Sequence, residues 1–122
     1  MTLRFQLLIL SVVLLAGCGA DRQPLAPGPL PAWLTSLITD LEAQPPANPP
    51  AFIARYEFTD DVVYFLPQRC CDIQSTVYRT DGAILCHPDG GITGSGDGRC
   101  PGFFAQRKNE EIVWRDARGA TR

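Results

Sequence analysis

The chain has 122 residues, 45% of them hydrophobic, five cysteines and a formal charge of −2 at pH 7. This length accommodates one small domain. A slightly acidic chain without a basic stripe argues against nucleic-acid binding and against electrostatic attachment to anionic lipid headgroups.

Residues 1–18 have the pattern of an export signal. Arg4 supplies a positive start, Phe5 to Leu15 is an almost unbroken apolar run, and Leu15-Ala16-Gly17-Cys18 closes it. A run this short, ending in small residues, is typical of a cleaved signal peptide and not of a membrane-spanning helix. The tetrad resembles the lipobox of bacterial lipoproteins. The resemblance implies that residues 1–17 are removed and that Cys18 carries a diacylglycerol and an acylated amino group. The alternative is an ordinary secretory signal with a chance cysteine.

The same resemblance implies a lipid-anchored protein of the bacterial cell envelope. Gly19 follows the cysteine at a position where aspartate signals retention in the inner membrane of enterobacteria, so the outer membrane, at its periplasmic face or surface, is favoured. Residues 18–30 are then the lipidated cysteine and a proline-rich tether. The expected partners are the membrane, reached through the lipid, and another envelope protein.

Apolar residues at helical spacing predict one amphipathic helix over about residues 31–43. The stripe consists of Trp33, Leu34, Leu37, Ile38 and Leu41. Pro31 suits the first turn, and the prolines at 45 and 46 prevent the helix from continuing.

Strand-favouring segments follow the helix at 52–58, 62–66, 75–79, 83–86 and 111–115. Asp81-Gly82, between the third and fourth segments, is a strong hairpin signal. We therefore expect an α+β domain at residues 31–116, in which the helix packs on a small antiparallel β-meander. A flexible tail is expected at 117–122.

Four cysteines remain after Cys18, namely Cys70, Cys71, Cys86 and Cys100. An even number of cysteines in a small exported domain predicts a disulfide framework. A bond between Cys70 and Cys71 is disfavoured because adjacent Cα atoms are only about 3.8 Å apart. The other two pairings each join one of these neighbours to Cys86 and the other to Cys100, and the sequence leaves both open. Either pairing pins the glycine-rich loop at residues 87–99.

Several motifs around this loop occur in a fixed order. Cys70-Cys71-Asp72 is followed by Tyr78-x-x-Asp81-Gly82, then by Cys86-x-Pro-Asp-Gly-Gly-x-Thr-Gly-x-Gly-Asp-Gly98 and a last cysteine. The order resembles an uncharacterised domain family of bacterial lipoproteins and other exported proteins. The resemblance covers about residues 62–115 and implies no activity.

The loop and its surroundings carry oxygen ligands in Asp72, Asp89, Thr93 and Asp97. Calcium takes six to eight such oxygens, so a calcium site is one interpretation. The favoured interpretation is that the carboxylates cap backbone N–H groups and that no cofactor is bound. An anion cradle of backbone N–H groups is a further alternative. A zinc site using the cysteines and His87 lacks the usual paired spacing.

No complete catalytic set is recognisable in the sequence. His87 could act as a general base only with a nucleophile, and no nucleophile motif is present. We therefore expect a non-catalytic binding or structural module. Two alternatives stay open. One is a metal-assisted envelope hydrolase that uses Asp72, Asp89, Asp97 and His87. The other is a small inhibitor-like module, which the architecture alone supports.

Overall fold

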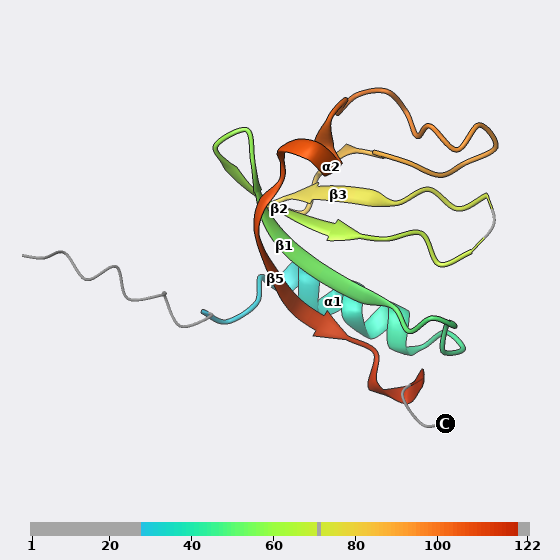
Figure 1. The fold of residues 1–122 in the computed structure, drawn as a ribbon. Helices are drawn as coiled ribbons and strands as arrows, with labels where there is room; N and C mark the ends of the chain where they lie inside the picture. Colours follow the sequence, from blue (N-terminus) through green and yellow to red (C-terminus); the bar gives the residue numbers. More distant parts are fainter. Residues whose placement is uncertain (1–27, 71, 120–122) are drawn as a thin grey trace, which may run out of the picture.

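The computed structural model describes residues 28–70 and 72–119 (Figure 1). The predicted signal peptide, Cys18, most of the tether and Cys71 lie outside the described residues. Within the described ranges, no helix is long and apolar enough to cross a membrane. A five-stranded antiparallel sheet, a long helix near the start and a short helix before the last strand form the domain, so the expected α+β class is confirmed.

Helix α1 spans Ala32–Glu42, one residue shorter at each end than the sequence predicts. It starts after Pro31, whose carbonyl accepts hydrogen bonds from the backbone N–H groups of Leu34 and Thr35 at 3.0 and 3.1 Å. Leu34 and Leu41, one from each end of the apolar stripe, are buried. The amphipathic pattern therefore identifies the face that packs on the sheet.

The sheet has the strand order β4-β3-β2-β1-β5. Its strands are β1 (Phe52–Phe58), β2 (Asp61–Leu66), β3 (Thr76–Arg79), β4 (Ile84–Cys86) and β5 (Lys108–Arg115). The first four form the expected meander. Strand β5 pairs with β1, at the opposite edge from β4, so the chain crosses the sheet before its last strand.

The two faces of the sheet carry separate hydrophobic clusters, because side chains alternate along each strand. On one face, Ile53 and Tyr64 pack against Leu34 and Leu41 of α1. The opposite face carries an aromatic cluster. This second cluster includes Tyr56, Phe58, Val63, Phe65, Val77, Cys86, Cys100 and Phe103. Phe103 begins α2 (Phe103–Gln106), a short helix that the sequence did not predict.

The hairpin predicted at Asp81-Gly82 is confirmed, and it also holds the start of α1. Trp33 donates its indole Nε1–H to the carbonyl of Thr80 at 2.8 Å. Gly82 has φ +88°, and a Cβ added there would lie 2.7 Å from Cγ of Trp33. Glycine is therefore required both for the turn and for the close approach of the indole ring.

The chain after β5 differs from the predicted flexible tail. Residues Ala117–Gly119 form a 3₁₀ turn, and Asp116 is buried. Arg118 bonds both Asp116 and backbone carbonyls at the end of α1. Through residue 119, this segment therefore packs against the helix.

Candidate functional site

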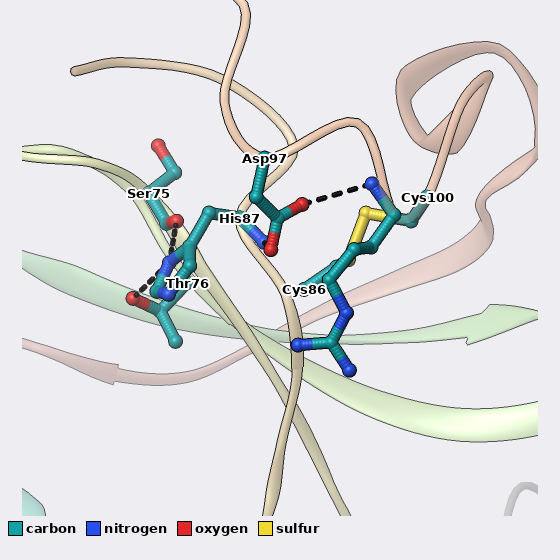
Figure 2. Close-up of a disulfide and its surroundings, with 7 residues drawn as sticks. Ser75, Thr76, Cys86, His87, Asp97 and Cys100 are labelled. Atoms are coloured by element: carbon teal, nitrogen blue, oxygen red, sulfur yellow. Dashed lines mark hydrogen bonds between the residues drawn. A yellow bond between two sulfur atoms is a disulfide. The ribbon is translucent and has the colours of Figure 1, made fainter.

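The glycine-rich loop is closed by a disulfide between Cys86 and Cys100, whose Cα atoms are 6.0 Å apart (Figure 2). A disulfide was expected, but the predicted pairing of Cys86 and Cys100 with Cys70 and Cys71 is wrong. Among the three ways of pairing four cysteines, the one that joins Cys86 to Cys100 also joins the neighbours Cys70 and Cys71, and the short distance between adjacent Cα atoms disfavours that second bond.

The observed pairing follows from where the two cysteines lie. Cys86 is the last residue of β4, and Cys100 precedes the turn into α2. Both side chains are buried in the aromatic cluster beside Phe103. The loop from 87 to 99 leaves this cluster and returns to it, so the disulfide joins its two ends.

Tight turns bring the loop back on itself. The N–H of Gly96 donates to the carbonyl of Gly90 at 3.1 Å, and the N–H of Asp97 donates to that of His87 at 2.9 Å. A Cβ on Gly96 would overlap the carbonyl oxygen of His87 and lie 2.8 Å from the backbone N of Asp89. Gly96 also has φ +69°. Only glycine satisfies both requirements.

Two of the predicted ligands cap the loop's own backbone. One carboxylate oxygen of Asp97 accepts the N–H of His87 at 3.0 Å, and the other accepts the N–H of Arg99 at 2.9 Å (Figure 2). Thr93 Oγ1 accepts the N–H of Ser95 at 3.3 Å. Desolvation alone would raise the pKa of Asp97, but these N–H groups and nearby positive charge outweigh it and lower the pKa.

The remaining carboxylates do not join Asp97. Asp89 has one buried carboxylate oxygen without a hydrogen-bond partner among the described residues. Asp72 is exposed on the connection between β2 and β3. Across residues 28–70 and 72–119, no group of three or more His, Cys, Asp or Glu residues could hold a metal ion. The predicted ligand set is therefore dispersed.

His87 faces away from the carboxylates. Its Nδ1 lies 2.9 Å from the carbonyl oxygen of Ser75 and 3.3 Å from Oγ1 of Thr76 (Figure 2). A carbonyl can only accept a hydrogen bond, so we assign the proton of the neutral ring to Nδ1, which leaves Nε2 as the acceptor. The imidazole thus ties the loop to the start of β3.

A hollow of about 340 Å³ lies beside the disulfide. Its lining comes from the loop (His87, Pro88, Ser95, Gly98), from Cys100, Pro101 and Gly102, and from Phe103, Phe104 and Ala105 of α2. This hollow could not be predicted from the sequence, because α2 is too short to produce a periodic pattern. Most of the lining is apolar or backbone, which suits recognition of an apolar group.

One family model matches the chain. It is described as a domain of unknown function (DUF6970) and matches residues 39–116, which include the end of α1, the whole sheet, the loop and α2. Neither a search of curated proteins nor a search of solved structures found a match.

Proposed function

The chain belongs to the DUF6970 family of domains of unknown function, and we propose that it is a lipid-anchored, non-catalytic binding module of the bacterial cell envelope. The support for the anchor is the sequence of residues 1–18, with its apolar run and its Leu-Ala-Gly-Cys end. The support for the binding role comes from the loop and the hollow beside it.

The observation that carries the choice of a binder over an enzyme is the use of Asp97 as a capping residue. Both of its carboxylate oxygens accept backbone N–H groups, and the His87 ring is directed to Ser75 and Thr76. A metal-assisted hydrolase would need these groups, with Asp72 and Asp89, to converge on an open cleft. Capping contacts of this kind instead indicate that the side chains maintain the conformation of the loop.

The point at which the described chain begins supports a binding surface that faces away from the bilayer. Figure 1 shows this point, drawn in blue, beside the start of α1. The loop at 87–99, drawn in orange, lies beyond the opposite end of the strands. A lipid attached at Cys18 would therefore leave the loop at 87–99 free to meet another exported protein.

Membrane fractionation of a Cys18→Ser variant tests the anchor. We expect the variant to leave the membrane fraction, because its attachment depends on the lipid alone. Gly19→Asp is the matched control, since it keeps Cys18 and should stay membrane-bound. Undiminished membrane attachment of Cys18→Ser would contradict the proposal.

An activity screen tests the enzymatic alternative. Purified protein is assayed for hydrolysis of chromogenic phosphoesters and carboxylic esters, with and without divalent cations. The matched variant is Asp72→Asn, because Asp72 is exposed and its replacement leaves the loop contacts intact. Cation-dependent hydrolysis that disappears in this variant would overturn the non-catalytic role.

A further inference from the structure

Arg107 lies over the exposed side of the aromatic cluster. Its guanidinium carbon is 4.6 Å from the ring centre of Tyr56 and 5.0 Å from that of Phe104. The ring centres of Phe65 and Phe103 each lie 5.6 Å from the same carbon. Cation–π contacts with four rings fix the guanidinium in one place, and the side chain is half-buried there.

Among the residues that the structure describes, none accepts a hydrogen bond from this guanidinium. Within the described ranges, Arg107 forms no ion pair and no side-chain hydrogen bond, whereas Arg55 and Arg118 are both paired with carboxylates. The nearby Glu110 accepts the hydroxyl of Tyr56. A positioned guanidinium presents a planar fork of donors that matches a carboxylate.

Phe104 connects this guanidinium to the hollow beside the disulfide. Its ring contributes to the lining of the hollow and contacts Arg107, and the residue is 44% exposed. At about 340 Å³, the hollow has room for one large apolar side chain. An apolar hollow therefore lies next to a cation that has no carboxylate partner among the described residues, and Phe104 contacts both.

We propose that this surface, formed by Phe104, Arg107 and the hollow, binds the C-terminal residue of a partner polypeptide. The partner's apolar side chain fills the hollow, and its terminal carboxylate accepts hydrogen bonds from Arg107. In a C-terminal residue both groups are attached to one Cα, which suits two subsites that share a single ring. This inference rests on the proposed binding role and specifies the chemistry of the partner.

The surface also has the composition and rigidity expected of an interface centre. Arginine and aromatic residues are enriched among the residues that dominate binding energies. The disulfide fixes one side of the hollow, and the stacked rings hold Arg107 before any ligand arrives. Little side-chain ordering would therefore oppose binding.

NMR titration of the isotope-labelled exported protein in detergent tests the proposal. The probes are N-acetyl-Gly-Gly-Xaa peptides with phenylalanine, leucine or tryptophan at Xaa, each as a free acid and as a C-terminal amide. We expect the acids to shift resonances at 87–88, 98–101 and 103–107. The amides should bind at least about tenfold more weakly, because they lack the charge-assisted pair.

Variants identify the carboxylate subsite. Arg107→Gln should reduce acid binding to the level of the amide, and Arg107→Lys should restore only part of it, since lysine keeps the charge but not the fork. Arg79→Gln, at the exposed end of β3, is the matched control for the loss of one positive charge and should bind like the wild type. Near-UV circular dichroism checks that the aromatic cluster is intact in every variant.

Three results would overturn the proposal: no binding by any acid at millimolar concentration, equal affinity for acid and amide, or unchanged affinity in folded Arg107→Gln. Equal binding of the internal-acid probe N-acetyl-Asp-Phe-amide would also overturn the assignment to a chain terminus. The titration does not depend on Cys18. A failed anchor in the fractionation experiment is therefore distinguishable from a failed binding site.

Discussion

Arg118 and Glu42, separated by 76 residues in the chain, are joined by a hydrogen bond of 2.7 Å from the guanidinium to the backbone carbonyl. The same guanidinium donates to the carbonyls of Gln44 at 3.1 Å and Leu41 at 3.3 Å. Asp116 holds it from the other side through both carboxylate oxygens. Because carbonyls at a helix C-terminus lack partners within the helix, Arg118 serves as a C-terminal cap for α1.

Arg118→Ala is expected to lower the melting temperature, because it exposes the end of α1 and leaves buried Asp116 without its main partner. Arg118→Lys should recover part of the loss, since lysine keeps the charge but cannot reach three carbonyls at once. Arg99→Ala, on the exposed loop, is the control. Thermal unfolding followed by circular dichroism measures all three. Equal melting temperatures for Arg118→Ala and the control would contradict the capping role.

Gly96→Ala and Gly94→Ala separate the effect of backbone strain from that of close packing. Both glycines have positive φ, +69° and +74°, so alanine costs about 1–2 kcal/mol at either position. A Cβ at residue 94 meets open space, whereas one at residue 96 overlaps backbone atoms of residues 87–89. Chemical denaturation should therefore show a clearly larger loss for Gly96→Ala. A loss no larger than that of Gly94→Ala would mean that the loop does not pack as described.

The disulfide between Cys86 and Cys100 should contribute about 3 kcal/mol to the free energy of unfolding, given a sequence separation of 14 between its cysteines. The double variant Cys86→Ser/Cys100→Ser, compared with the wild type by urea denaturation, measures this contribution. Non-reducing peptide mapping should recover the peptides of Cys86 and Cys100 together. A cross-linked peptide that contains Cys70 and Cys100 would restore the pairing that the structure contradicts.

Tyr56 should ionise well above the ordinary pKa of tyrosine. Burial, followed by the hydrogen bond to Glu110, raises its pKa to about 12, and burial also raises the pKa of Tyr78. Because the pKa is higher in the folded state, the contribution of the neutral Tyr56 hydroxyl to the free energy of unfolding is complete below pH 10. This contribution is lost as the pH rises through about 12. Tyrosinate absorbance should show a late component that Tyr56→Phe removes and Glu110→Gln shifts to lower pH. A single step at pH 10 in the folded protein would contradict this environment.

The helix and the first four strands could be predicted because their residues repeat at helical or strand spacing. Strand β5 starts earlier than predicted, because Lys108 joins the sheet by pairing with Glu57 of β1 and has no sequence signal of its own. Asn109, with φ +55°, lies at an irregularity in this pairing. The caps and stacked rings depend on tertiary contacts. Neither the role of Arg118 nor the position of Arg107 over Tyr56 has a local signal in the sequence.

The features of the candidate site likewise divide into those with a local sequence signal and those that depend on tertiary contacts. Asp97 could be recognised as a capping residue because both of its partners belong to the same loop. Arg99 is two residues away, and His87 is the first residue of the loop. The disulfide could not be assigned, because the distance between Cys86 and Cys100 is set by the path of the loop and not by their separation in the chain. The hollow likewise exists only because α2 folds back beside the loop.

The most direct test of the central claim is the mass and N-terminal chemistry of the protein extracted from bacterial membranes. The proposal predicts a chain that begins at Cys18, with a diacylglycerol on its sulfur and an acyl group on its amino nitrogen. Digestion should release this lipidated peptide separately from the residues of the folded domain. A chain that retains residues 1–17, or one that begins elsewhere with an unmodified Cys18 thiol, would contradict the lipid-anchored assignment.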